Sequence, residues 1–168
     1  MSTENNYQQY ASTVLEHLPK GAFLTTSENG KPNTMTIAWG NIGFMWKKPV
    51  FTIMVRQSRY THHLLEKTPA FTVSIPTDDT MKEALGICGS KSGRDLDKIA
   101  AANLSLQPGK EISVPVIQGC GLHFECKIIG RQDLKQGDLN ESEDTAWYKE
   151  GDYHSLYYGE IITCYTEK

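Results

Sequence analysis

The sequence lacks the signatures of several large classes of protein. No apolar run approaches the ~20 residues that a transmembrane helix requires, and residues 1–6 lack the charged and then apolar pattern of an export signal. The four cysteines contain no CxxC pair, which excludes the common zinc and thioredoxin-type motifs. The 17 Lys and Arg residues are scattered among 20 acids, so no dense basic face for nucleic acid is expected. These absences predict a cytoplasmic protein that binds neither a membrane nor nucleic acid.

Catalytic and metal-binding motifs are equally scarce. The chain has no Gly-x-Ser-x-Gly elbow, no HExxH sequence, no GxxxxGK[ST] loop and no GxGxxG turn. His62 and His63 are adjacent and point to different sides of an expected helix, while His17 and His123 have no partners at ligand spacing. We therefore predict no metal site. Without a self-sufficient nucleophile, any chemistry is expected to come from a cofactor that the protein positions.

What the chain does contain is enough apolar material for one domain. It has three Trp, eight Tyr and five Phe, and 39% of its 168 residues are hydrophobic, so a full core is expected. No repeat or linker divides it, and we predict a single domain over residues 1–168. Its N-terminal helix is expected within residues 1–18 and a β-barrel over residues 20–165.

The expected elements follow from apolar periodicity and from β-branched and aromatic runs. Helices are predicted over 4–18, 58–67 (with Ser58 as N-cap), 80–88 and 94–103. Strands are predicted over 21–26, 33–39, 50–55, 70–75, 112–118, 121–132 and 156–165, with a hairpin turn at Glu28–Lys31 and a solvated loop over 138–152. This order favours a mainly β fold with peripheral helices, an antiparallel, Greek-key-like barrel that is closed or partly closed.

Four polar residues at the end of an apolar strand form a candidate phosphate clamp. Two guanidinium groups, two hydroxyls and the free amides of a helix start lie within six residues; the side chains are those of Arg56, Ser58, Arg59 and Thr61. The alternative is that the arginines pair with surface acids and the hydroxyls cap the helix.

The preceding strand is a candidate surface for a planar ring. In Thr34–Trp39, the two threonines share one face, and Met35, Ile37 and Trp39 share the other. A flavin ring presents donors and acceptors along one edge and apolar faces, so a strand backbone beside Trp39 suits it. The alternative is an ordinary strand whose Met35, Ile37 and Trp39 lie in the core. Ring and phosphate together make flavin mononucleotide (FMN) the first hypothesis.

Two further features give weaker evidence of a binding site than the clamp and the strand. The basic, glycine-flanked turn Ser90–Asp95, with Lys98, offers more phosphate or ribityl contacts, or is simply a capped surface turn. His154 precedes the last expected strand, where it is either a donor to a reduced ring or a surface histidine.

Taken in order along the chain, these segments resemble the flavin reductase-like family of FMN-binding split barrels, which includes flavoredoxin. The matching segments are Asn33–Gly40, Lys48–Val50, Val55–Thr61 with Leu64–Leu65, Cys88–Asp95 with Asp97–Lys98, and His154–Ile161. The resemblance covers about residues 20–165 and implies a homodimeric split β-barrel with FMN near the subunit interface.

The resemblance also implies roles for individual residues. Thr34, Met35, Thr36, Ile37, Ala38 and Trp39 would line the ring, and Arg56, Ser58, Arg59 and Thr61 would hold the phosphate end, with Tyr60 among the cofactor-binding residues. Ser92, Gly93, Arg94 and Lys98 would add contacts near the phosphate or from the partner subunit. His154 would lie close to the flavin or nicotinamide and is the one candidate catalytic residue.

The expected activity is that of an oxidoreductase working through FMN. Hydride would pass from NADH or NADPH to the flavin, and electrons would leave to free flavin or to a protein acceptor. An electron carrier reduced by a protein partner, without NAD(P)H turnover, remains an alternative. So does a barrel without flavin that serves as a binding or interaction module. The residues do not choose the donor or the acceptor.

Overall fold

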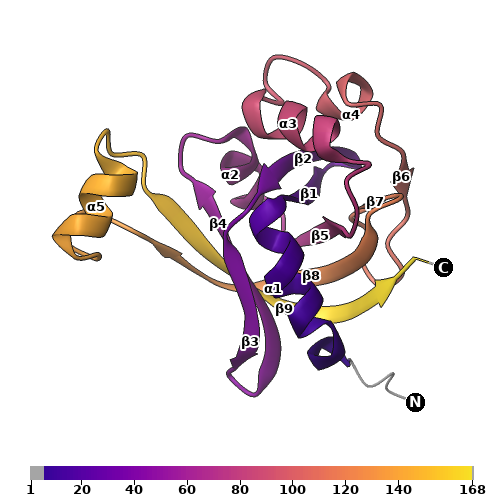
Figure 1. Cartoon of the computed structure of the whole chain (residues 1–168), viewed down its shortest axis with the longest axis horizontal. Helices are drawn as coiled ribbons and strands as arrows, with labels where there is room; N and C mark the ends of the chain where they lie inside the picture. Colours follow the sequence, from indigo (N-terminus) through magenta and orange to yellow (C-terminus); the bar gives the residue numbers. More distant parts are fainter. Residues whose placement is uncertain (1–5, 168) are drawn as a thin grey trace.

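The β-branched and aromatic runs form the strands of a seven-stranded antiparallel sheet in a computed structural model that describes residues 6–167 (Figure 1). Its strands, in sheet order, are β2 (Lys31–Ile37), β1 (Ala22–Glu28), β5 (Ala70–Pro76), β8 (Gly121–Asp133), β9 (His154–Thr166), β4 (Lys48–Arg56) and β3 (Gly40–Met45). A separate short pair joins β6 (Leu106–Gln107) to β7 (Val116–Ile117).

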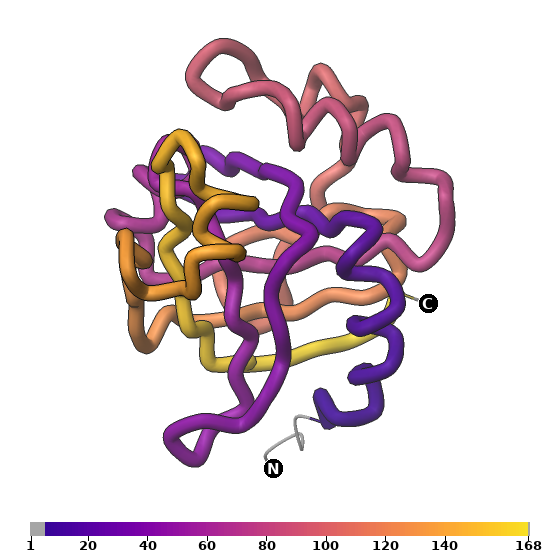
Figure 2. The backbone as a smooth tube through the Cα atoms, turned by 60° about the vertical axis from the view of Figure 1, so that its left-hand side comes forward, coloured from indigo at the N-terminus to yellow at the C-terminus, as the bar shows by residue number. Residues whose placement is uncertain are grey.

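The link between β2 and β3 forces the sheet to curl. These two strands lie at opposite edges of the sheet, yet only Ala38 and Trp39 separate them along the chain. The three Cα–Cα steps from Ile37 to Gly40 span at most about 11 Å. The two edges must therefore approach each other, so the sheet curls into a split barrel (Figures 1 and 2).

Aromatic side chains fill the barrel. Phe51, Phe71, Phe124 and Tyr157 are almost completely buried, and the rings of Phe51 and Phe124 meet edge to face at 5.1 Å. Each such side chain contributes about 1.5–3 kcal/mol by leaving water. Helix α1 (Ala11–His17) adds Val14 to this core, between 3₁₀ turns at Tyr7–Tyr10 and Leu18–Lys20.

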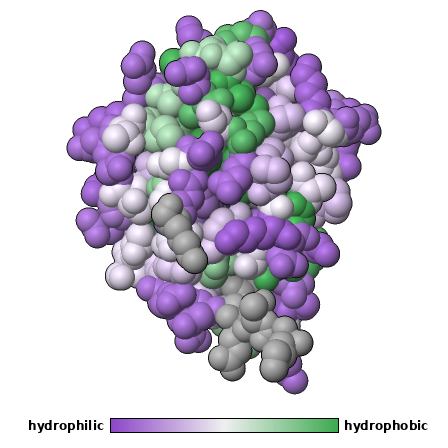
Figure 3. Space-filling view, turned by 90° about the vertical axis from the view of Figure 1, so that its right-hand side faces the viewer, coloured by the Kyte–Doolittle hydropathy of each residue, from purple (hydrophilic) through white to green (hydrophobic). Residues whose placement is uncertain are grey.

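A second, smaller cluster lies outside the sheet, beneath helix α3 (Lys82–Ser90). Ala84 and Cys88 of that helix pack on Phe23, Ile117 and Cys120. Helix α4 (Lys98–Ala101) follows it, and both cross the upper end of the barrel in Figure 1. The face of the molecule that lies on the right-hand side of Figure 1 is mostly hydrophilic, and its largest hydrophobic area lies toward the top of Figure 3.

Two hairpins use left-handed backbone at their tips. The predicted turn at Glu28–Lys31 is confirmed, with Asn29 and Gly30 at φ values of 51° and 77°. The β3–β4 hairpin turns through Trp46 and Lys47, at 52° and 58°, and extends away from the barrel in Figures 1 and 2.

Several predicted elements need correction. Residues 138–152 were expected to form a loop, but helix α5 (Glu141–Tyr148) occupies their centre. It begins because the Asn140 side chain accepts from the Glu143 amide and because three acids favour the positive end of the first turn. In Figure 1, α5 lies at the ends of β8 and β9, away from the barrel body.

The bounds of several other helices and strands also differ from the prediction. Strand β3 was not predicted, because its glycines and Asn41 weaken the β signal, and the predicted strand over 112–118 survives only as β7. Helix α2 (Tyr60–Leu65) has Arg59, not Ser58, at its N-cap. Residues 4 and 5 of the predicted N-terminal helix lie outside the described residues.

Candidate functional site

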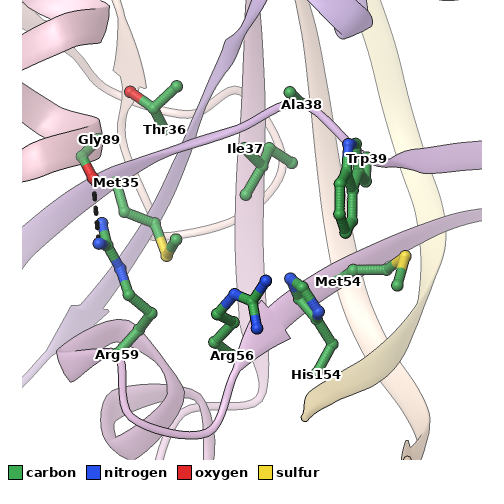
Figure 4. Close-up of a pocket in the computed structure, with 10 residues that line it drawn as sticks. All are labelled: Met35, Thr36, Ile37, Ala38, Trp39, Met54, Arg56, Arg59, Gly89 and His154. Carbon is green, nitrogen blue, oxygen red and sulfur yellow. Dashed lines mark hydrogen bonds between the residues drawn. The ribbon is translucent and has the colours of Figure 1, made fainter. Parts of the chain in front are cut away.

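A cavity of about 250 Å³ opens at the split of the barrel. Strand β2 and the link after it form one wall, and the end of β4 and the start of β9 form the other (Figure 4). Its lining residues are Met35, Thr36, Ile37, Ala38, Trp39, Met54, Arg56, Arg59, Gly89 and His154. The structure thus brings together the β2 segment, both clamp arginines and the histidine, which are separated by up to 119 residues in the chain (154 − 35).

The β2 wall combines buried side chains with open backbone. Met35 and Ile37 are only 5% and 4% exposed and belong to the barrel core, as the alternative interpretation of this strand predicts, but Trp39, which it also placed in the core, does not. Because β2 pairs with β1 alone, alternate backbone N–H and C=O groups face the split. The Thr36 hydroxyl donates to the Leu85 carbonyl of α3 at 2.7 Å, which fixes that helix against the strand.

Trp39 stands at the mouth of the cavity. Its ring is 38% exposed and meets Trp147 of α5 edge to face, with ring centroids 4.8 Å apart. Gly40 follows it because a Cβ there would come within 2.5 Å of the Thr52 carbonyl oxygen. A side chain at position 40 would push β3 off β4, so the glycine holds the indole in place.

Arg56 is held at the cavity wall by two backbone carbonyls and an aromatic ring. Its guanidinium donates to the carbonyls of Asp152 at 3.0 Å and Trp147 at 3.2 Å, and lies 5.3 Å from the centroid of the Tyr148 ring. These contacts tie α5 and the following turn to β4. They also place a positive charge beside whatever the cavity binds.

Arg59 reaches the other end of the cavity and meets Lys98 there. Arg59 donates to the Gly89 carbonyl at 3.0 Å and the Cys88 carbonyl at 3.3 Å, and Lys98 donates to the same Cys88 carbonyl at 3.4 Å. Lys98 is 4% exposed. Burial, with the nearby Arg59 charge, lowers the pKa of Lys98 to about 8, and burial also lowers the pKa of Arg59.

This pair of cations has unusual surroundings. Among residues 6–167, no carboxylate forms an ion pair with either side chain, although Asp152 acts on Arg59 from a longer distance. Buried charges are normally paired, and the carbonyl dipoles of Cys88 and Gly89 compensate only in part. The donor set is that of a site for an anion.

The two hydroxyls predicted for the clamp are engaged elsewhere. Ser58 donates to the Asp152 carboxylate through its hydroxyl at 2.6 Å and its amide at 2.9 Å. Thr61 is 1% exposed, and its hydroxyl accepts from the Asn33 amide at 3.0 Å. Neither lines the cavity.

The second basic turn borders a different cavity, of about 450 Å³, which is also lined by β2 and α2. Predicted site residues along its wall are Thr34, Tyr60, Gly93, Arg94 and Lys98. Arg94 donates to the Ser58 carbonyl at 3.2 Å and lies over the Tyr60 ring, while the Ser92 hydroxyl accepts from the Arg94 amide. Thr34 is fully buried and donates to the Leu24 carbonyl. Of these residues, Lys98 is the one that shares a hydrogen-bond acceptor, the Cys88 carbonyl, with Arg59 of the first cavity.

His154 begins β9 and pairs with Arg56 across β4. Its ring is 8% exposed, and Nδ1 lies 2.7 Å from the Tyr148 hydroxyl oxygen. Burial, and secondarily the Arg56 charge, lowers the pKa of His154 to about 4, so the imidazole is neutral at pH 7.

Sequence reasoning missed the contribution of α5. Trp147 and Tyr148 lie in an acidic segment that was predicted as loop, so neither was considered for the site. The helix start at Asn140, followed three residues later by Glu143, is a capping-box spacing that would have indicated this helix. Met54 and Gly89 were missed because no local pattern places them at the split.

No helix within residues 6–167 has the length and apolar character to cross a bilayer. No group of three metal-ligating side chains occurs in that range either.

One protein-family model matches nearly the whole chain. The family model described as flavin reductase like domain matches residues 15–168. An uncharacterized protein of Archaeoglobus fulgidus is 29% identical over 150 residues, which are 89% of this chain and 74% of that protein.

Solved structures share the fold. Flavoredoxin of Desulfovibrio vulgaris superimposes with a TM-score of 0.68 at 22% identity, over 88% of this chain and 69% of that one. An NADH:FAD oxidoreductase of Streptomyces globisporus gives 0.65 at 22% identity, over 88% and 74%. At these identities the likeness concerns the fold alone.

Proposed function

The chain belongs to the flavin reductase-like family, and from this premise we propose that it is an oxidoreductase that binds FMN at the split of its barrel and takes reducing equivalents from NADH or NADPH. The electrons leave to free flavin or to a protein acceptor. The residues that would hold FMN are the β2 wall for the ring, and Arg59 with Lys98 for the phosphate.

One observation carries this proposal: Arg59 lies at one end of a cavity whose other end is aromatic, and it shares the Cys88 carbonyl with the buried Lys98 of the neighbouring cavity. Arg59 and Lys98 lack a carboxylate partner within the described chain, and a phosphate dianion would supply the missing charge. Trp39 and His154 lie toward the opposite end, in Figure 4, where a planar ring has both a polar edge and an apolar face to meet. The cavity therefore suits a ligand with an anionic tail and a flat head.

FMN, when bound, accepts a hydride and passes electrons on singly or in pairs. The protein contributes position and charge. The open backbone edge of Met35–Ile37 orients the ring, Arg56 raises the positive potential beside it, and Trp39 with Trp147 covers the mouth. The nicotinamide donor would enter at this mouth, because the sequence offers no dinucleotide-binding turn.

We also propose a homodimer. Strand β3 forms one edge of the sheet, and its hairpin exposes Phe44 and Trp46 to 65% and 63%. Large exposed aromatics beside an unpaired strand edge favour association. Light scattering on the purified holoprotein tests this, and a strictly monomeric holoprotein contradicts it.

The test of FMN binding separates the phosphate from the ring. Replacing Arg59 by alanine removes charge-assisted hydrogen bonds worth about 1.5–3 kcal/mol, so FMN should bind roughly 10–100-fold more weakly. Riboflavin, which has the ring but no phosphate, is the control and should bind with nearly unchanged affinity. Equal weakening of both ligands, or no FMN binding by the wild type, would refute the assignment.

An electron carrier without NAD(P)H turnover is the second candidate. The exposed indoles of Trp39 and Trp147 at the mouth favour it, since a redox protein can dock where a ring edge is accessible. Both kinds of name occur among the structural neighbours, flavoredoxin and NADH:FAD oxidoreductase. Anaerobic addition of NADH or NADPH to the FMN-loaded protein decides between the two. Rapid loss of the yellow flavin absorption supports the reductase, and loss only with a low-potential protein donor supports the carrier.

A further inference from the structure

The contact between Tyr148 and His154 determines where the imidazole carries its proton. Tyr148 is the last residue of α5, is 4% exposed, and places its hydroxyl oxygen 2.7 Å from His154 Nδ1. The planes of the two rings are 76° apart, which lets the hydroxyl approach Nδ1 at the edge of the imidazole. Figure 4 shows that imidazole beside Arg56 in the cavity.

The direction of this hydrogen bond follows from what the hydroxyl can do. The backbone amide of His154 donates to the Tyr148 oxygen. The phenol proton then needs an acceptor of its own, because a buried hydroxyl is rarely left without one. Within the described residues, His154 Nδ1 is the acceptor that it reaches. The hydroxyl therefore donates to Nδ1, and Nδ1 carries no proton.

A neutral imidazole has one proton, so it must reside on Nε2. Burial keeps His154 neutral, and no residue within 6–167 forms a hydrogen bond with Nε2. The charged groups that act on the ring are Arg56 from β4 and Asp152 from the turn before β9. Trp39, from the link after β2, lies against the ring with centroids 5.3 Å apart.

We infer that Tyr148 is a positioning residue that holds His154 as the Nε2–H tautomer, so that an N–H donor faces the cavity. Its role in the reaction depends on the proposed function: the donor would meet the polar edge of a reduced, electron-rich ring bound there. Without Tyr148, Nδ1–H and Nε2–H forms would interchange, and the cavity would face a bare nitrogen part of the time.

The test is made first on the flavin-free protein. Nitrogen-15 NMR of the histidine side chains at pH 7 distinguishes a protonated from an unprotonated ring nitrogen, and a His154→Gln variant identifies the His154 signals. The wild type should show Nε2 protonated and Nδ1 unprotonated. Tyr148→Phe should show both nitrogens partly protonated. A wild type with Nδ1 protonated, or with a mixture, would overturn the inference even if the variant does not fold.

Tyr153→Phe is the matched control. Tyr153 stacks on Tyr148 with centroids 4.5 Å apart, but its hydroxyl donates to Asp144 at 2.6 Å rather than to the imidazole. Its removal should leave the His154 tautomer unchanged. An equal tautomer change in this variant would mean that packing, and not the Tyr148 hydroxyl, holds the ring.

A second measurement connects the tautomer to the flavin. Tyr148→Phe should weaken reduced FMN about 5–10-fold while changing the affinity for oxidised FMN less than 2-fold. Equal changes in both affinities would refute the role toward the reduced ring. If the wild type binds no FMN, the proposed function and this role fail together, whereas the tautomer result still stands or falls by the NMR spectrum alone.

Discussion

The side chains of Arg59 and Lys98 converge on one backbone carbonyl, that of Cys88, at 3.3 and 3.4 Å. Arg59 comes from the start of α2 and Lys98 from α4, so the convergence holds two elements against the end of α3. The two like charges repel each other, and Lys98 is buried while Arg59 is half-buried, so water screens the repulsion only in part. An anion placed between them would offset this repulsion and favour the charged form of both side chains. A change in their ionisation therefore reports ligand binding.

The first prediction follows from the lowered pKa of Lys98, about 8. A bound phosphate dianion favours the charged ammonium and raises this pKa. Above pH 8 the free protein must therefore take up a proton to bind, so the FMN dissociation constant should rise with pH, by up to tenfold per unit. Fluorescence titration at pH 7, 8 and 9 measures it.

Lys98→Met and riboflavin serve as controls for this pH dependence. The variant should bind FMN more weakly and with little change between pH 7 and 9, since the titrating group is gone. Riboflavin should also show little change. A parallel pH dependence for riboflavin would place the effect at the ring instead of the phosphate.

A second prediction concerns stability in acid. The pKa of His154 is about 4, below its ordinary value, so between pH 6.5 and 4 the unfolded chain binds a proton that the folded chain does not. This part of the stability is present above pH 6.5 and is lost as the pH falls toward 4. We expect a loss on the order of 2–3 kcal/mol from this group.

His62 and His123 have lowered pKa values too, mainly through burial, and add to the acid loss. Urea unfolding of the wild type and His154→Gln at pH 7 and pH 4.5 isolates one histidine. The stability difference between the two proteins should shrink at the lower pH, because the variant has no imidazole to protonate. A constant difference would mean that His154 takes up its proton as readily in the folded protein as in the unfolded chain.

Two groups in the candidate site could be predicted from local sequence. Thr34–Trp39 form one continuous segment, and Arg56 and Arg59 lie only three positions apart. A strand end that enters a helix places Arg56 and Arg59 close together whatever the rest of the fold does. Their meeting with His154 was predictable only through the family resemblance. It depends on the pairing of β4 with β9, a contact across about 100 residues that no local pattern encodes.

The hydroxyl part of the clamp illustrates the opposite case. Ser58 and Thr61 have the right chemistry at the right spacing, but Asp152 and Asn33 take their hydrogen bonds. Both partners come from distant segments. Likewise Tyr148 lies in an acidic segment whose composition indicated a loop, although the cap at Asn140 starts a helix there. Composition described the surface of α5 and not its buried side.

A third prediction tests the link that carries Trp39. Gly40→Ala would place a Cβ 2.5 Å from the Thr52 carbonyl oxygen, so the β3–β4 pairing must shift. We expect a loss of about 2–4 kcal/mol in the free energy of unfolding, together with weaker FMN binding. Gly43→Ala is the control on the same strand, because a Cβ there meets no atom within 4 Å. Equal effects of the two changes would show that β3 responds only to lost glycine flexibility.

The last prediction concerns the buried carboxylate of Glu125, which organises a loop that the sequence left undefined. Its oxygens accept from the amides of Lys110 at 2.6 Å, Glu111 at 2.8 Å and Ile112 at 3.0 Å, and from the Tyr165 hydroxyl. Glu125→Gln replaces one acceptor oxygen by an N–H₂ group that faces these donors. Because the site is fully buried, we expect a loss of about 3 kcal/mol.

Glu160→Gln is the matched control for this change. Glu160 pairs with Lys48 at 2.8 Å on a partly exposed surface, so its neutralisation should cost less than about 1 kcal/mol. Hydrogen exchange locates the difference: the amides of residues 110–112 should lose protection in Glu125→Gln and keep it in Glu160→Gln. Uniform loss of protection throughout the barrel would mean that Glu125 supports the core as a whole. Protection lost at these three amides alone would show that one carboxylate holds the loop against the sheet.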